Sequence, residues 1–192
     1  MRYLTPLMLF VLCASQAMAV EKSVINGVAI YRQPPQAYEL AKILFPPKTR
    51  SITLNQEPNT PPNTQAASAA APVTAVGFMI NFEYNSVHVL PKSRPYLDSL
   101  GEMLNFKQLK DKPLMIEGHA DATGDEHYNL KLSEARAQAI KDYLVSVHRI
   151  EAKRLLTQGQ GENRLLDPAH PAADINRRAE FKPWGDEVIV SQ

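Results

Sequence analysis

The sequence predicts an α+β fold, in which a mixed four-stranded sheet has its helices packed on one face. Over residues 76–188, apolar segments of strand length alternate with two longer segments whose apolar residues recur every three or four positions. Their order along the chain is β-α-β-α-β-β, and each helical crossover favours a parallel pair of strands. The 192 residues suffice for one such domain and an additional segment, and no internal repeat is visible.

The first strand and the first helix of this domain follow from local signals. An alternating pattern over residues 77–82 predicts the strand. Ser93 is a favourable residue to cap a helix, and Pro95 suits its first turn, where the missing N–H would be unpaired in any case. The helix then buries leucines spaced three or four residues apart, namely Leu97, Leu100 and Leu104.

The remaining elements of the domain are three strands and one long helix. We expect strands over 113–118, 153–158 and 177–183, and a helix over 127–148. Residues 189–192 form a short C-terminal tail. The apolar spacing assigns the inner face of the long helix to Leu132, Ala135, Ala139, Ile140, Tyr143, Leu144 and Val147.

Residues 1–19 have the pattern of a cleaved secretory signal peptide. An apolar run over 4–14 follows Arg2, and Ala17 and Ala19 flank one residue to form a small-x-small cleavage site. The run is shorter than the about 20 apolar residues that a membrane-spanning helix needs. We therefore expect an exported, periplasmic protein whose mature chain starts after this segment.

The only cysteine, Cys13, would be removed with that signal peptide. The mature chain would then contain no disulfide, although it is exported. Lipidation of Cys13 is the alternative, but the bulky Leu12 stands where a lipoprotein signal has a small residue. No other stretch approaches 18 apolar residues, so we expect no transmembrane segment in the mature chain.

Residues 51–75 are expected to form a linker. Pro, Asn, Thr, Gln and Ala dominate the segment, which cannot bury enough apolar surface to offset the entropy of ordering. Residues 20–50 are expected to form an N-terminal arm, with strand-like residues around an Asn-Gly turn and a short amphipathic helix over 36–44. About 30 residues are too few to fold alone. Two interpretations stay open for the arm, a loosely docked segment and a docking element for an envelope protein partner.

Composition and motif spacing disfavour several function classes. The 21 Lys and Arg balance 20 Asp and Glu, so the chain lacks the strong positive field of a nucleic-acid binder. His119, Asp121 and His127 fit no standard zinc spacing, and the Gly-x-Gly segment at 159–161 is expected to be a turn because it lacks the Lys-Ser/Thr of a phosphate loop. Ser133 lies in no nucleophile elbow. We expect no metal, no cofactor and no catalysis.

Three motifs occur in order along the predicted domain. Residues 118–124 read Gly-His-Ala-Asp-Ala-Thr-Gly after the second strand, residues 128–137 open the long helix, and residues 176–180 read Asn-Arg-Arg-Ala-Glu at the last strand. Over roughly residues 78–182, the ordered set resembles the peptidoglycan-binding domain of the OmpA-like family, which OmpA C-terminal domains, the Pal lipoprotein and MotB share. The sequence departs from the usual pattern at Ala120, where Thr is commoner.

The resemblance implies a site for the diaminopimelate residue of the peptidoglycan stem peptide. That ligand group carries an ammonium and a carboxylate on one carbon. Asp121 would pair with the ammonium, and Arg136 would hold the carboxylate through two parallel N–H bonds. Neighbouring strand residues face opposite sides, so only one of Arg177 and Arg178 should reach the ligand. The implied ligand-binding residues are Asp121, Thr123, Asn129, Arg136, Arg177 and Arg178.

The function that follows is a non-enzymatic tether between an envelope component and the cell wall. An accessory subunit of an envelope-spanning secretion, pilus or motor complex is the alternative, with residues 20–50 contacting the partner. A cell-wall hydrolase is a third hypothesis. It would release soluble fragments from purified sacculi, whereas a tether would bind them without release.

Overall fold

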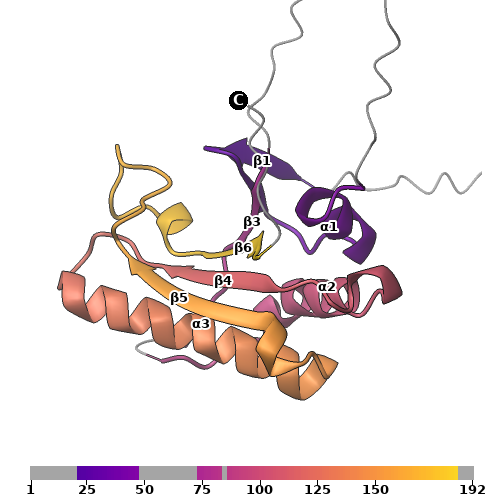
Figure 1. Ribbon diagram of the computed structural model, residues 1–192. Helices are drawn as coiled ribbons and strands as arrows, with labels where there is room; N and C mark the ends of the chain where they lie inside the picture. The colour runs from indigo at the N-terminus through magenta and orange to yellow at the C-terminus, as the bar shows by residue number, and fades with distance from the viewer. Residues whose placement is uncertain (1–20, 48–72, 84–85, 186–192) are drawn as a thin grey trace, which may run out of the picture.

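A computed structural model describes residues 21–47, 73–83 and 86–185 of the chain (Figure 1). The predicted signal peptide, most of the predicted linker and the C-terminal tail lie outside the described residues. The strands of the described part are β1 (Lys22–Ile25), β2 (Val28–Tyr31), β3 (Ala75–Phe78), β4 (Leu114–His119), β5 (Leu155–Gly161) and β6 (Ala179–Pro183). The α-helices of the described part are α1 (Ala37–Leu44), α2 (Arg94–Leu104) and α3 (Glu126–His148).

The strands form one mixed sheet in the order β1-β2-β3-β6-β4-β5. The pairs β2/β3 and β4/β5 are parallel, and the pairs β1/β2, β3/β6 and β4/β6 are antiparallel. The predicted α+β class is confirmed, and the elements from β3 to β6 follow the predicted order. The sheet of the described residues has six strands where the sequence predicted four, because the N-terminal segment contributes two.

The N-terminal segment is part of the domain, which corrects the expectation of a separate arm over residues 20–50. β1 and β2 form a hairpin whose turn residues, Asn26 and Gly27, have φ values of 51° and 76°, as a tight turn of this kind requires. β2 then pairs with β3, and Tyr31 and Leu40 are buried in the main core. Most apolar residues that the segment cannot bury by itself are covered by the rest of the sheet and by α2, whereas Val24 and Tyr38 stay exposed.

The boundary between the linker and the domain also lies earlier than predicted. Ala75 is the first residue of β3 and is buried, and Val73 packs against the core. The predicted first strand at 77–82 corresponds to β3 and the residues after it, where Phe82 forms an isolated bridge with Val89. Residue 76 is therefore inside the folded unit and does not mark its start.

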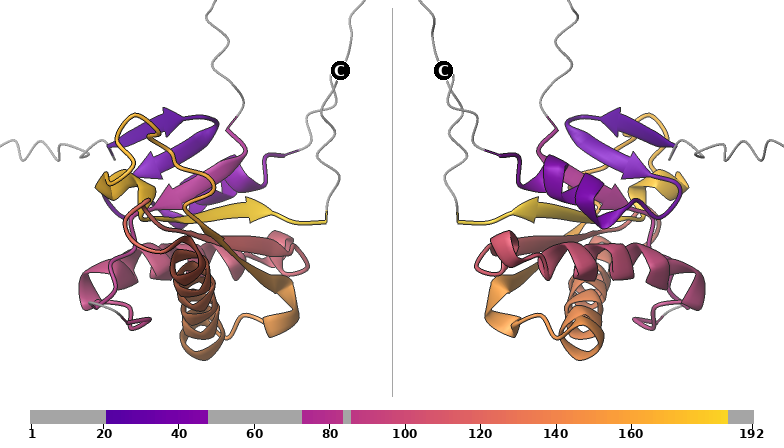
Figure 2. Two further views of the ribbon diagram at one scale, coloured as in Figure 1. Left: turned by 90° about the vertical axis from the view of Figure 1, so that its left-hand side faces the viewer. Right: turned by 90° about the vertical axis from the view of Figure 1, so that its right-hand side faces the viewer.

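All three described α-helices cover the same face of the sheet (Figures 1 and 2). α3 lies along β4 and β5, and α2 lies between α3 and α1. Alternate strand residues, such as Phe78, Ile116 and Phe181, point into this helical layer and are fully buried. The opposite face has a small apolar cluster of Val28, Ile30, Ala75 and Leu166, and next to it a group of buried charged side chains.

The inner face of α3 differs in part from the predicted one. Ile140 and Leu144 are buried as expected, but Ala135 is exposed and Val147 is 53% exposed. The N-terminal half instead turns small and polar residues to the sheet, namely Asn129, Ser133 and Ala137.

Close packing of α3 against β4 and β5 explains this difference. A Cβ atom on Gly118 would lie 2.1 Å from the backbone oxygen of Ser133, and one on Gly159 would lie 2.7 Å from that of Leu130. Large side chains cannot fit between backbones at this distance. The predicted Gly-x-Gly turn at 159–161 is accordingly the end of β5, which runs beneath the helix. Within the described residues, no helix combines the length and the apolar character that spanning a membrane requires.

Candidate functional site

A pocket of about 290 Å³ opens where the chain leaves β3 and meets the middle of α3. Its walls combine an apolar side with two cations and one carboxylate. The lining residues are Met79, Ile80, Asn81, Phe82, Arg136, Asp174 and Arg177. Three segments that are far apart in the sequence therefore meet here: the residues after β3, helix α3, and the short 3-10 turn Asp174–Asn176 before β6.

Arg136 projects from α3 into this pocket. Its guanidinium carbon lies 4.8 Å from the centroid of the Phe82 ring, and its Nε donates a hydrogen bond to the Ser86 carbonyl oxygen at 3.4 Å. Burial and then the nearby charge of Arg177 lower the pKa of Arg136, but a guanidinium stays protonated in proteins. The stacking on Phe82 and the single backbone bond fix its position and leave further N–H donors for a ligand.

Asp121 lies directly after β4, in the loop that leads to α3. Its Oδ2 accepts a hydrogen bond from Arg177 Nη1 at 2.5 Å, and its Oδ1 accepts one from the Thr123 backbone N–H at 3.2 Å. Burial opposes ionisation of this carboxyl, but the bonds from Arg177 and Thr123 outweigh it and lower the pKa of Asp121. Asp121 is therefore a fixed anion at neutral pH.

Arg177 connects Asp121 to the pocket lining. One guanidinium nitrogen donates to Asp121 and another to Asp174, three residues earlier in the chain. The Arg177 side chain is 44% exposed, so it reaches solvent as well as its two acids. The hydrogen bond to Asp121 raises the pKa of Arg177 further. The cavity is therefore lined by two arginines and one aspartate, Asp174, and Arg177 links this lining to Asp121, which is not itself a lining residue.

Asn129 and Thr123 support the Asp121 loop and are not among the residues that line the pocket. The Asn129 amide donates to the carbonyl oxygens of Asp121 (3.2 Å) and Thr123 (3.1 Å) and to Glu162 Oε2 (2.8 Å). Asn129 is 5% exposed. Its side chain therefore ties the start of α3 to the loop that carries the fixed anion.

Arg178 lies on the other side of β6 from the pocket. It is 5% exposed, its Nε donates to Glu180 Oε1 at 2.7 Å, and its Nη2 donates to the Arg164 carbonyl oxygen at 3.0 Å. Of the two candidate arginines, Arg177 alone is among the pocket-lining residues. Strand β6 begins at Ala179, two residues later than predicted, so both arginines precede it; their side chains are nevertheless separated as the alternation of an extended chain predicts.

The alternative constellations considered from the sequence do not converge in the structure. His119 is buried on the sheet face opposite the helices, Asp121 is bonded to Arg177, and His127 is exposed. Ser133 is 2% exposed, donates to the Leu130 carbonyl oxygen and accepts from the Gly161 N–H. The serine hydroxyl thus joins α3 to β5 and is not placed for nucleophilic attack.

Sequence reasoning missed the apolar wall of the pocket and its one acidic lining residue, Asp174. Met79 and Ile80 follow β3 as ordinary strand-like residues, and nothing in their pattern marks a binding surface. Phe82 can be assigned to the pocket wall only once Arg136 is known to be its neighbour, since aromatic rings attract guanidinium groups. Asp174 precedes Arg177 by three residues, a spacing that brings side chains together in a helical turn.

Comparison with known proteins identifies the family. The sequence pattern described as "OmpA family" matches residues 81–179, which contain the Asp121 loop, Arg136 and the two arginines before β6. The chain belongs to the OmpA family. The matched region includes every ligand-binding residue that the sequence implied.

Two curated relatives show how much of a longer OmpA-family protein this chain resembles. It is 33% identical over 129 residues to outer membrane porin F of Pseudomonas aeruginosa, covering 64% of this chain and 36% of that protein. It is 35% identical over 117 residues to outer membrane protein A of Klebsiella aerogenes, covering 59% and 33% respectively. The chain thus spans about a third of the length of these outer membrane proteins.

A solved structure has the same fold. The periplasmic domain of Helicobacter pylori MotB (residues 78–256) aligns over 61% of this chain and 79% of that domain, with a TM-score of 0.50 and 15% identity. At this identity, the likeness concerns the fold alone.

Proposed function

We propose that the protein binds peptidoglycan non-covalently and recognises the diaminopimelate of the stem peptide in the pocket between β3 and α3. The observation that carries the proposal is a cavity lined by two arginines, Arg136 and Arg177, the second of which is bonded to the ionised Asp121 next to the cavity. A ligand with an ammonium and a carboxylate on one carbon needs this combination. Membership of the OmpA family supports the same assignment.

The ion pair between Asp121 and Arg177 would exchange when the ligand binds. The ligand ammonium would replace Arg177 at Asp121, and Arg177 would keep its contact with Asp174 or join Arg136 on the ligand carboxylate. Exchange between partners costs little at a half-exposed ion pair. The apolar wall of Met79, Ile80 and Phe82 would contact the methylene chain of the ligand.

The protein would act by anchoring, without catalysis, in the periplasm and at the outer membrane of the envelope. Export would use the signal peptide expected at residues 1–19. The alternative of an accessory subunit in a secretion, pilus or motor complex depended on unsatisfied apolar residues within 20–50. Several of those residues, such as Tyr31 and Leu40, are covered within the domain, whereas Val24 and Tyr38 stay exposed; the tether needs no further partner and is the simpler proposal.

Co-sedimentation with purified diaminopimelate-containing sacculi tests this function. The mature chain should pellet with the sacculi, whereas Asp121→Ala and Arg136→Ala should stay in the supernatant. Losing one partner of a desolvated charge pair costs about 2–5 kcal/mol, enough to abolish weak binding. Asp142→Ala is a matched control, because Asp142 is an exposed aspartate on α3 whose contact is with Gln138.

Two results would reject the proposal. Pelleting of folded Asp121→Ala and Arg136→Ala at the wild-type level would exclude this pocket as the binding site. Release of soluble wall fragments by the wild-type protein would indicate a hydrolase in place of a tether.

A further inference from the structure

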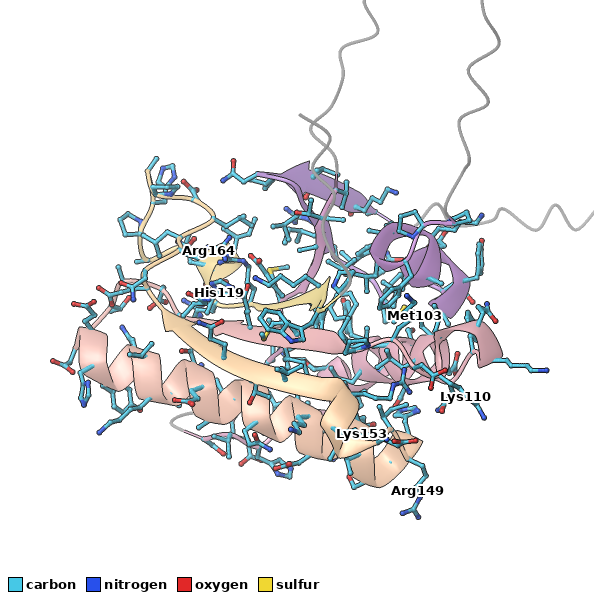
Figure 3. All side chains as sticks on the ribbon, viewed as in Figure 1. Met103, Lys110, His119, Arg149, Lys153 and Arg164 are labelled. Atoms are coloured by element: carbon cyan, nitrogen blue, oxygen red, sulfur yellow. The ribbon has the colours of Figure 1, made fainter. Side chains whose placement is uncertain are left out.

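Three ionisable side chains converge on the sheet face opposite the helices. Glu117 and His119 belong to β4, and Glu180 belongs to the adjacent β6, where it is the register partner of Glu117. Each is at most 3% exposed, and one ligand atom from each lies within 4.8 Å of the others. We name these three residues the back-face cluster. Figure 3 shows His119 at the end of β4, near Arg164, which belongs to the segment between β5 and β6.

His119 has an unusual position in the back-face cluster. Its ring is completely buried, and neither ring nitrogen has a hydrogen-bond partner. The nearest carboxylate oxygen, Glu180 Oε1, lies 3.7 Å from Nε2. Buried polar groups in folded proteins are nearly always hydrogen-bonded, so an orphaned imidazole beside two carboxylates calls for a partner.

The two carboxylates are neutralised by cations of different mobility. Arg178 is buried, and both of its contacts with Glu180 fall on Oε1. Glu117 receives Lys182 at 2.7 Å and Arg164 at 3.4 Å. The Lys182 and Arg164 side chains are 32% and 55% exposed, so each can leave Glu117 for solvent by rotation of its side chain.

We propose that the back-face cluster is a binding site for one divalent transition-metal cation of the zinc type, held by Glu117, His119 and Glu180 in exchange for Lys182 and Arg164. The exchange replaces two monovalent cations next to Glu117 by one divalent cation, so the positive charge beside the carboxylates is unchanged. One imidazole nitrogen and two carboxylate oxygens are a ligand set that zinc accepts, with a fourth position for water. The imidazole disfavours Ca²⁺ and Mg²⁺, which take oxygen ligands.

The back-face cluster cannot be recognised in the sequence, because its three residues do not have the spacing of a known metal-binding motif. Glu117 and His119 are two residues apart on one strand, so they share a face. Glu180 joins them through the register of β4 against β6, 63 positions away from Glu117 in the numbering of the chain. The bound cation would link these two strands and satisfy the ring of His119.

Zinc titration of the full mature chain, after treatment with a chelator, tests the proposal. The wild-type protein should bind one Zn²⁺, and His119→Gln should bind at least about tenfold more weakly, since even outer-shell changes cost that much. His170→Gln is the matched control, because His170 is exposed and contacts Asp167 at 2.9 Å, the kind of surface pair that binds zinc adventitiously. It should leave the one-to-one binding unchanged.

A second variant tests the exchange itself and keeps the experiment decisive if His119→Gln does not fold. Lys182→Met removes the cation that competes for Glu117, so it should tighten Zn²⁺ binding, whereas a site elsewhere would not respond. Co²⁺ should give the visible absorption of a four-coordinate site in the same proteins. Absence of one-to-one binding in the wild type, equal binding by folded His119→Gln, or no tightening in Lys182→Met would overturn the proposal.

Discussion

Arg177 and Arg178 are neighbours in the sequence, yet their guanidinium groups belong to two different charged regions. Arg177 is half-exposed and shared between Asp121 and Asp174 at the pocket. Arg178 is buried, and its contacts are with Glu180 and the backbone of residues 164 and 176. The same residue type therefore has two environments one position apart.

The comparison teaches that exposure decides which charged group is free to exchange partners. A buried charge that loses its partner has no access to water, so its pairing is part of the fold. A half-exposed charge can trade one partner for another at small cost, and this is what ligand binding at the pocket requires. The predictions below test this distinction, starting with the largest expected effect.

Truncation of the two arginines should separate the two regions by stability. Arg178→Met should lower the free energy of unfolding by about 3–5 kcal/mol, because Glu180 then stays buried without its cation. Arg177→Met should change it by about 0–1 kcal/mol, since the Arg177 side chain is 44% exposed and Asp121 keeps its bond from the Thr123 N–H. Urea denaturation followed by circular dichroism measures both. Equal destabilisation by the two variants would contradict the claim that burial makes the ion pair of Arg178 more important for stability than those of Arg177.

The amide of Asn129 should stabilise the pocket without contacting the ligand. Asn129→Ala should cost about 1–3 kcal/mol of stability, because buried acceptors in the Asp121 loop lose their donor. Gln138→Ala is the matched control on the same helix, since its exposed amide donates to Asp142 and accepts from Thr157 at the surface, and it should cost about 0.2–0.5 kcal/mol. Thermal or urea unfolding of both variants gives the difference. If Asn129→Ala is as stable as Gln138→Ala, the loop is held by other contacts.

The smallest effect is expected at Asp174. Its side chain is 85% exposed, so Asp174→Ala should change stability by about 0–1 kcal/mol. The variant should still bind sacculi, because Asp121 and Arg136 are intact. Co-sedimentation alongside the wild type measures this. Loss of binding in a folded Asp174→Ala protein would show that ligand binding requires Asp174 and would contradict this prediction.

The sequence predicted the fold well where local patterns and long-range contacts agree. Helix α2 has its proline and its leucine stripe in one window, and the structure has this helix at the expected place. The predicted cap was wrong, because the Ser93 hydroxyl accepts from the Asn81 N–H and makes no cap bond to the helix. The hairpin β1/β2 was not predicted as part of the sheet, because its partner β3 begins more than 40 positions after Tyr31. Local patterns contain no information on that pairing.

The family resemblance implied the charged residues of the candidate site but not its apolar wall. It implied Asp121, Arg136 and one of Arg177 and Arg178, and the structure has Arg136 and Arg177 in the lining of one pocket. The inner face of α3 was partly wrong since apolar spacing ignores how closely a helix approaches a glycine strand. Gly118 brings Ser133 to the sheet, where a larger residue would not fit.

Binding of two stem peptides that differ in one group tests the central claim most directly. Isothermal titration of the mature chain would compare a peptide containing diaminopimelate with one in which lysine replaces it, so that the ammonium is kept and the carboxylate is lost. The account predicts at least about tenfold tighter binding of the diaminopimelate peptide, a difference of about 1.4 kcal/mol. Arg136→Lys should reduce this preference, because an ammonium cannot make the two-bond contact. Equal affinity of the wild-type protein for the two peptides would contradict the account.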